Sequence, residues 1–302
     1  MLIQNACAPS DIIDIMTCQG QRIHNHSEPL FATIENNPLP LQHVNITPQD
    51  GAPMDSAMSS ISQTELPEID AKEFEKVVET RRSIRRFTDE PVPDEILNRC
   101  LDLAMLAPNS CNLQPWEFYI IKDPAVKKKL VHACLDQNAA KTSQALIAVV
   151  ARTDTWYKHC DENITAWPDP KMPKLVEDFY SKVAKFQYAL GPLGILGLFK
   201  KGFFGIAGLT RPVPRGPYSR AEMKEWATKS TALAAQTLML SLRAHGYDSC
   251  PMEGFDEKRV RKIMALPSKA SVVMFVAAGK RSERGVYNTR YRFDREKFVH
   301  VI

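Results

Sequence analysis

The stretch ETRRSIRRF, residues 79–87, places four arginines within six positions around one serine, Ser83. Guanidinium groups stay charged and bind phosphate through paired hydrogen bonds. Three interpretations are open at this point: a nucleic-acid patch, a solvated helix end where arginine is favourable for the helix dipole, and a pocket for an anion. They belong to different classes of protein, so the surrounding sequence has to decide between them.

The composition favours a folded protein without a specialisation for nucleic acid. The chain has 302 residues, of which 44% are hydrophobic, so it can bury a substantial core. Its net charge of +4, from 39 basic and 35 acidic residues, is a milder excess than a dedicated nucleic-acid binder shows. The seven cysteines form no CxxC pair and no zinc-site spacing, which is typical of reduced thiols in a cytoplasmic protein.

The N-terminal part of the chain differs from the rest. Residues 1–67 are rich in Pro, Asn, Gln, Ser and Asp and carry little periodic apolar pattern, so we predict a weakly structured extension. The first residues lack the basic and continuous apolar regions of a signal peptide, which again favours a cytoplasmic location. One folded domain is expected over residues 68–302, with a lid-like insertion at about 152–219.

Apolar periodicity predicts the main elements of that domain. The second of the predicted helices is expected to be capped by Asp94. Helices and strands mix without strict βαβ alternation, which predicts an α+β fold. Helices are predicted at 72–81, 91–107, 124–135, 220–246 and 255–266, and strands at 116–121, 145–151 and 271–279.

The segment 152–219 has a looser pattern, rich in Pro and Gly, and includes the apolar run ALGPLGILGLFKKGFFGIAG at 189–208. Three interpretations stay open for this run: a mobile lid, part of the core, and a membrane-surface contact helped by Lys200 and Lys201. Its uninterrupted apolar part has 11 residues. A bilayer span needs about 20, so no stable membrane insertion is expected.

Four short segments carry groups suited to bind a ligand, although GxGxxG, P-loop, GxSxG and HExxH motifs do not occur. The first is RRSIRRF. The second, APNSCNLQPW at 107–116, holds amides and hydroxyls between two prolines. The third, QNAAK, places Asn138 and Lys141 on one face of a helical turn. The fourth, CPMEGF, contains Gly254, where backbone can approach a ligand closely. Each segment alone also fits an ordinary turn or helix end.

Taken in this order, together with the closing arginines of NTRYRF, the segments resemble the nitroreductase family of FMN-dependent oxidoreductases over about residues 72–302. The resemblance implies a central, mostly antiparallel sheet flanked by helices, and a homodimer. It implies hydride transfer from NAD(P)H through the flavin to a nitroaromatic, quinone or enone acceptor. A specialised flavoenzyme of the same fold, such as a dehydrogenase, dehalogenase or flavin-fragmenting enzyme, stays open, as does a basic RNA- or membrane-surface-binding protein.

The resemblance also implies a cofactor-binding role for particular residues. The FMN phosphate, ribityl chain and pyrimidine edge would be held by Arg81, Arg82, Ser83 and Arg85. The phosphate grip would be completed by Arg290 and Arg292, and the pyrimidine edge by Asn138 and Lys141. The flavin ring would be flanked by Glu253 and by Gly254, whose N–H would lie near N5.

A last group would reach the same flavin from the other subunit of the homodimer: Pro108, Asn109, Ser110 and Asn112. Asn109 stands where many family members carry serine. Arg86 matches no ligand-binding position and is expected to be a surface charge. No catalytic side chain and no metal are assigned, because the flavin carries the hydride chemistry.

Overall fold

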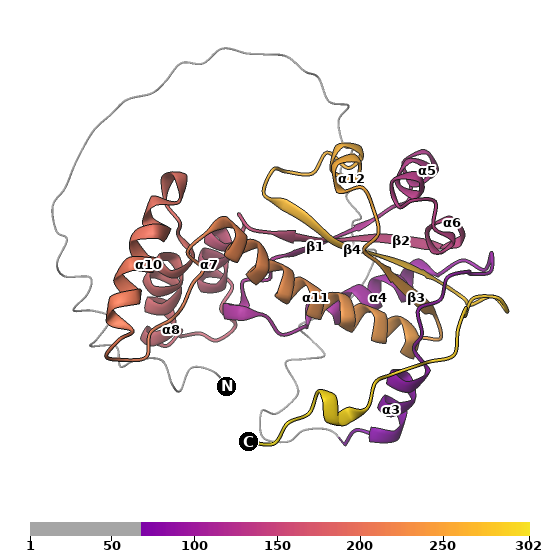
Figure 1. Ribbon diagram of the computed structural model, residues 1–302, viewed down its shortest axis with the longest axis horizontal. Coiled ribbons are helices and arrows are strands. Elements are labelled where there is room, and N and C mark those ends of the chain that lie inside the picture. Colours follow the sequence, from indigo (N-terminus) through magenta and orange to yellow (C-terminus); the bar gives the residue numbers. More distant parts are fainter. Residues whose placement is uncertain (1–67) are drawn as a thin grey trace, which may run out of the picture. The chain divides into compact units, whose positions relative to one another are not determined.

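The structure is a computed structural model that describes residues 68–302 (Figure 1). The weakly structured extension predicted for residues 1–67 lies outside the described residues. The described part forms one compact unit built on a four-stranded sheet. Its mixture of helices and a central antiparallel sheet confirms the predicted α+β class.

The sheet has the strand order β1-β2-β4-β3, and every pair in it is antiparallel. The two central strands are β2 (Ala145–Arg152) and β4 (Ala270–Gly279), which are almost entirely buried. The edge strands are β1 (Trp116–Ile120) and β3 (Asp248–Met252). The three predicted strands are confirmed. The strand β3 was not predicted; it includes the first half of CPMEGF, for which a ligand-binding segment or an ordinary turn is expected.

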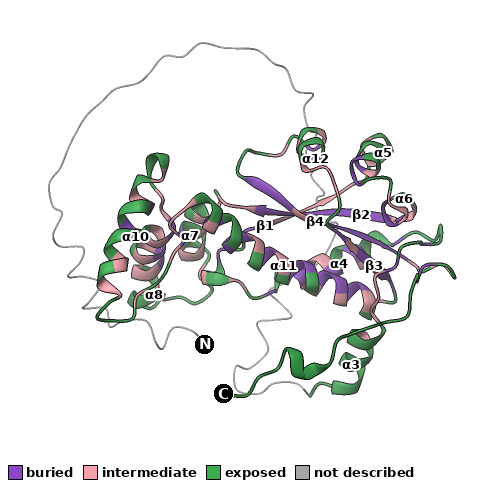
Figure 2. Cartoon of the chain, in the orientation of Figure 1, coloured by how far each residue is buried: buried purple, intermediate pink, exposed green. Residues whose placement is uncertain are grey.

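Helices cover both faces of the sheet, and the alternation of side chains along β2 separates the two cores. Ala148 and Val150 belong to one core, which includes α5 (Pro124–Ala133) and α12 (Glu257–Ile263). Ile147 and Val149 belong to the other, which includes α4 (Asp94–Met105) and α11 (Arg220–Ala244). Figures 1 and 2 show these helix pairs on opposite sides of a buried sheet. All four helices match predictions.

The longest helix within residues 68–302, α11, has 25 residues and runs beneath the sheet. The Ser219 hydroxyl caps its N-terminus by accepting a hydrogen bond from the Glu222 N–H at 3.2 Å. The predicted stop at Gly246 is confirmed within two residues, and Gly246 has a φ of 80°, which favours glycine. At 1.5 Å per residue α11 is about 37 Å long, so its ends reach different parts of the domain.

The cap predicted for α4 is wrong. The residue before the helix is Pro93, and Asp94 is already the first helical residue, with no capping hydrogen bond from its side chain. The Asp94 carboxylate instead accepts a hydrogen bond from Lys122. Its negative charge still lies in the first turn, where it is favourable for the helix dipole.

The segment predicted as a loose region is largely helical. It contains α7 (Trp156–Thr165), α8 (Lys174–Asp178), a short π-helix at Phe179–Ala184, α9 (Lys185–Tyr188) and α10 (Ile195–Ala207). Its aromatic core packs against the first turns of α11. No single helix in residues 68–302 is long and apolar enough to cross a membrane; by length and composition alone, only the bent pair Lys174–Tyr188 and Pro192–Ala207 qualifies.

The predicted first helix is confirmed as α3 (Ala71–Thr80), with Asp70 accepting a hydrogen bond from the Lys72 N–H. The helix buries none of its residues, and Phe74 is 59% exposed. The described chain closes with exposed aromatic side chains, among them Tyr291, Phe293 and Phe298. The smaller elements of the described residues are α6 (Asn138–Thr142) and 3₁₀ turns at Ser110–Asn112, Pro192–Gly194 and Arg295–Lys297.

Candidate functional site

The arginine-rich stretch is held beside the edge strand β3. Ser83 pairs in parallel with Ser249, and the Ile84 N–H donates to the Ser249 carbonyl at 3.1 Å. Ile84 and Phe87 are buried, which fixes the backbone between them. Because these two apolar side chains point into the core, Arg85 and Arg86 are left outside it.

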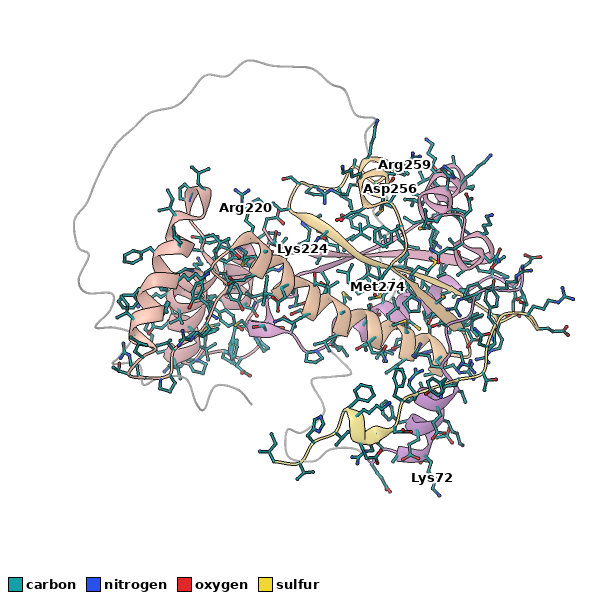
Figure 3. All side chains as sticks on the ribbon, in the orientation of Figure 1. Lys72, Arg220, Lys224, Asp256, Arg259 and Met274 are labelled. Carbon is teal, nitrogen blue, oxygen red and sulfur yellow. The ribbon has the colours of Figure 1, made fainter. Side chains whose placement is uncertain are left out.

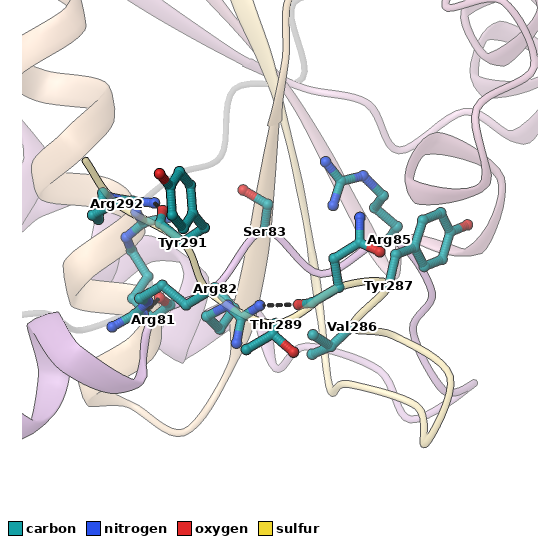
Figure 4. Close-up of a pocket in the computed structure, with 11 residues that line it drawn as sticks. Arg81, Arg82, Ser83, Arg85, Val286, Tyr287, Thr289, Tyr291 and Arg292 are labelled. Carbon is teal, nitrogen blue, oxygen red and sulfur yellow. Dashed lines mark hydrogen bonds between the residues drawn. The ribbon is translucent and has the colours of Figure 1, made fainter.

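The segment that follows β4 lies beside the arginine stretch. Arg290 donates to the Arg81 carbonyl at 2.6 Å, and Arg82 donates to the Asn288 carbonyl. Residues 286–292 and the arginine stretch thereby line one pocket (Figure 4). The two sequence motifs predicted to share the phosphate grip are brought together.

The pocket is strongly positive. It is lined by five arginines and by no acidic residue: Arg81, Arg82, Arg85, Arg290 and Arg292. Burial lowers the pKa of Arg81, and the charges of Arg290 and Arg292 lower it further. The nearby carboxylate of Asp248 is buried and already accepts hydrogen bonds from Arg281 and Arg243. The donor set therefore fits a dianionic phosphate, which would relieve the mutual repulsion of the arginines.

The pocket has two chemically different ends. Figure 4 shows Arg81, Arg82 and Arg292 on one side of Ser83, and Arg85 with Tyr287 on the other. The Arg85 guanidinium carbon lies 5.4 Å from the centre of the Tyr287 ring. The first end offers charge for a phosphate. The second offers a cation and a phenol, groups suited to the polar edge of a ring.

The helix α6 joins this second end. Asn138 donates to the Tyr287 hydroxyl at 3.0 Å. That hydrogen bond, followed by the hydrogen bond and charge of Arg86, lowers the pKa of Tyr287. Arg86 is exposed, as expected, but it also acts on a residue of the pocket. Lys141 lies on the same short helix, with its Nζ 3.8 Å from Asp136 Oδ1, and does not line the pocket.

The predicted Glu253–Gly254 segment follows β3 and is tied to the same region. Gln137 donates to the Gly254 carbonyl at 2.7 Å. A Cβ placed on Gly254 would lie 3.4 Å from that amide nitrogen, so the glycine packs directly against Gln137. Since Gln137 and Asn138 are adjacent, α6 connects Gly254 to Tyr287. Three segments distant in sequence therefore converge around one side of the pocket.

The loop 107–116 lies elsewhere in the chain. Thr231, near the middle of α11, donates to the Pro115 carbonyl at 3.1 Å. Arg243, in the last turn of α11, donates to Thr80 at the start of the arginine stretch. Twelve helical residues separate these two contacts, which is about 18 Å along the axis. The chain therefore does not bring Pro108, Asn109, Ser110 and Asn112 to its own arginine pocket.

The loop is nevertheless rigidly held. Three of its residues have left-handed backbone angles: Cys111, Asn112 and Gln114. Such angles are strained for side chains other than glycine and persist where surrounding contacts enforce them. Ser110 is hydrogen-bonded to the Tyr188 hydroxyl at 3.0 Å, and Asn112 donates to Asn163 at 2.7 Å. Helices α7 and α9 thus fix the loop.

The residues of the site that the sequence prediction did not assign include Gln137 and Tyr287. Tyr287 stands three positions before Arg290, immediately ahead of the recognised NTRYRF motif, and its position beside that motif was the available signal. Gln137 precedes Asn138 and carried no signal of its own. No cluster of three or more metal-binding side chains occurs among residues 68–302.

Comparison with known proteins assigns the class that the fold and pocket define. A model of the nitroreductase family matches residues 78–280. The chain is 30% identical over 237 residues to an NADH dehydrogenase of Thermus thermophilus, covering 76% of this chain and 96% of the relative. It is also 30% identical to YdgI of Bacillus subtilis, provisionally named an NAD(P)H nitroreductase, covering 75% and 97% of the two chains.

The fold is similar to that of a solved structure from Exiguobacterium sibiricum, provisionally described as a nitroreductase in complex with FMN. The TM-score is 0.56 and the identity 24%, covering 79% of this chain and all of the other. The family match spans more than half of the chain. The protein therefore belongs to the nitroreductase family, which confirms the resemblance inferred from the sequence.

Proposed function

We propose that the protein is an FMN-dependent oxidoreductase that transfers hydride from NAD(P)H through the flavin to a nitroaromatic, quinone or enone acceptor. The single observation that carries the proposal is a pocket with five arginines and no carboxylate in a chain of the nitroreductase family. An acid-free arginine cluster needs an anion to balance it, and the FMN phosphate is a dianion. The names of the Thermus and Bacillus relatives support a nicotinamide donor.

The two ends of the pocket fit the two ends of FMN. Arg81, Arg82 and Arg292 would hold the phosphate on one side of Ser83, and Arg290 would support them by fixing the Arg81 backbone. On the other side, Arg85 and Asn138 would bind the pyrimidine edge of the flavin. When bound, the flavin supplies the hydride chemistry.

The remaining predicted residues fit around the ring. Lys141, which lies on α6 with Asn138, would place a cation near the ring edge, where reduced flavin carries negative charge, and would favour the reduced form. Glu253 and Gly254 would flank the ring, where Gln137 holds their backbone in place. No side chain is assigned as an acid or base.

We further propose that the enzyme is a homodimer, in which the loop 107–116 completes the flavin site of the partner. The loop that carries Pro108, Asn109, Ser110 and Asn112 contacts α11 about 18 Å along its axis from the contact beside the arginine stretch, yet the loop is rigidly held, as a binding loop should be. The unburied α3 and the exposed closing aromatics supply apolar surface for such an interface. A cytoplasmic location is proposed with this function.

Anaerobic reduction tests the proposed activity. The purified protein should be yellow, and NADH or NADPH should bleach its flavin absorbance in the absence of oxygen. Adding a nitroaromatic, a quinone or an enone should then restore the colour and yield the reduced acceptor. A coloured protein that neither nicotinamide bleaches would contradict the proposed donor and favour a specialised flavoenzyme. A colourless protein that takes up no flavin would favour a binding protein instead.

A further inference from the structure

The helix α10 has an inverted distribution of polarity. Its outer side exposes Leu198 (72%), Phe199 (64%) and Ile206 (73%), while its inner side buries a lysine, Lys200, at 1% exposure. The exposed apolar residues recur at helical spacing, so they form one continuous stripe. With the neighbouring turns, this surface, called here the α10 face, comprises Leu193, Ile195, Leu198, Phe199, Phe203, Ile206 and Leu209.

The inner side of α10 is fixed, so the α10 face is held outward. The Lys200 ammonium donates to three carbonyls at the end of α9, those of Phe186, Gln187 and Ala189, at 2.7–2.9 Å. Gly197 is so close to the Tyr218 backbone that a Cβ there would lie 2.1 Å from its carbonyl oxygen. Rotating α10 to bury the α10 face would break both contacts.

The segment of sequence that carries the α10 face is basic. Between Asp178 and Glu222 the sequence contains seven basic residues and no acidic one. Lys182 and Lys185 pair with Asp178 and Asp161, and Lys200 is buried. The other four are exposed, and none has an ion-pair partner within residues 68–302: Lys201, Arg211, Arg215 and Arg220. Figure 3 shows Arg220 and Lys224 at the α10 end of α11.

The dimensions of α10 favour lying on a bilayer over crossing it. Its 13 residues span about 20 Å, short of the roughly 30 Å hydrocarbon core. The preceding helical segment meets it at a bend of 69° instead of extending it. An exposed apolar stripe bordered by unpaired cations is the arrangement by which surface helices bind anionic lipid.

We propose that the α10 face docks in the plane of an anionic lipid bilayer. The exposed leucine, isoleucine and phenylalanine side chains enter the boundary of the acyl chains, and Lys201 with the neighbouring arginines contacts the lipid phosphates. The inference goes beyond the proposed catalytic function and does not depend on the bound cofactor.

Vesicle co-sedimentation of the full chain with its cofactor tests the proposal. The protein should sediment with phosphatidylcholine vesicles containing about 30% phosphatidylserine, and about tenfold less with phosphatidylcholine alone. Raising the salt concentration should weaken binding. The double substitution Leu198→Ser/Phe199→Ser should lower the partition coefficient about tenfold or more. The control Leu135→Ser, at a similarly exposed leucine (68%) after α5, should leave it unchanged.

A charge variant measures the electrostatic contribution to vesicle binding. Because it changes exposed side chains alone, a loss of binding is not explained by misfolding. Lys201→Glu/Arg211→Glu alters two exposed side chains and none of the apolar residues of the α10 face, and it should lower binding to the anionic vesicles about tenfold or more. The proposal is overturned if the wild-type protein stays in solution with anionic vesicles, or if Leu198→Ser/Phe199→Ser binds as the wild type does.

Two further results would assign the α10 face to another occupant and so also overturn the proposal. The first is an assembly, seen by sedimentation velocity without lipid, that Leu198→Ser/Phe199→Ser splits while vesicles bind neither protein. The second is a raised KM for an aromatic acceptor in that variant without any vesicle binding by the wild type, which is the result expected for a lid.

Discussion

At the scale of single residues, the proposed phosphate site rests on charges that repel one another when no anion is present. Arg81 is partly buried, and the charges of Arg290 and Arg292 add to the desolvation that lowers its pKa. A bound phosphate would reverse this penalty, because each arginine would then make a charge-assisted hydrogen bond. Removing one such contact should therefore lower the affinity for FMN.

Arg292→Ala should weaken FMN binding, because the lost contact is a hydrogen bond between charged groups. Such bonds contribute about 1.5–3 kcal/mol, which corresponds to roughly a 10- to 150-fold higher dissociation constant. Fluorescence titration of the apoprotein with FMN measures the change. Arg259→Ala, at an exposed arginine on α12 that pairs with Asp256, serves as the control. Equal affinities of Arg292→Ala and the wild type would show that Arg292 makes no phosphate contact.

Lys200 should make stability depend on pH in the alkaline range. Burial lowers its pKa from 10.5 to about 8. Between these two values the unfolded chain binds a proton at Lys200 that the folded chain has lost, so the free energy of unfolding should rise with pH. Below about pH 8 both states are protonated, and the contribution is flat. Urea unfolding of the wild type and of Lys200→Met from pH 7 to 10.5 measures the difference, and parallel curves would contradict the assignment.

At the scale of elements, strong periodicity made most of the fold predictable. The strands β2 and β4 are continuous apolar runs, and α11 carries an alanine- and leucine-rich pattern that ends at Gly246. The strand β3 was missed because it is short and contains Pro251, which a strand tolerates only at an edge. The helices of 152–219 were missed because they are short and interrupted by prolines and glycines, so no period develops.

The proposed cofactor site was predictable only where its residues belong to short sequence motifs. The arginine stretch, Asn138 and the closing arginines were found because their residue types are unusual together. Gln137 and Tyr287 were not, since their roles arise from hydrogen bonds between segments far apart in the chain. Likewise, nothing in the sequence showed that α7 and α9 hold the loop 107–116 in place. The mobile lid considered for residues 189–208, which include α10, stays a prediction.

The hydrogen bond between α9 and the loop supplies a test at this scale. Tyr188→Phe removes a hydroxyl that contacts Ser110 at 3.0 Å and leaves the packing of the buried ring intact. The lost bond should cost about 0.5–1.5 kcal/mol, lowering the melting temperature by a few degrees. FMN should also dissociate faster, because a loosened loop closes the partner's site less well. Tyr157→Phe, at an exposed tyrosine of α7, should change neither the melting temperature nor the FMN dissociation rate.

At the scale of the whole molecule, the proposed site needs two chains. The pocket offers the phosphate grip, and the rigid loop 107–116 lies on another part of the same chain. In the proposed homodimer the two halves would come together, and the apolar surface of α3 would be covered. Obligate dimers commonly bury more than about 2,000 Å² in their interface.

The protein should therefore be a homodimer at all concentrations at which it keeps its flavin. Light scattering and sedimentation velocity should give twice the chain mass of 34.0 kDa. Dilution below the dimer dissociation constant should release FMN and lower the melting temperature together, since dimer and cofactor stabilise the same folded state. A monomer that retains flavin and activity would show that each chain completes its own site.

The most direct test of the central claim compares FMN with riboflavin, which differs only by the phosphate. Calorimetric titration of the apoprotein should show one FMN bound per chain, with riboflavin bound at least about a hundredfold more weakly, since two or more charge-assisted bonds are lost with the phosphate. A higher salt concentration should reduce the difference in affinity between FMN and riboflavin, because salt screens the charges of the phosphate and the arginines. Equal affinities for the two flavins, or binding of neither, would show that the arginine pocket is not a cofactor phosphate site.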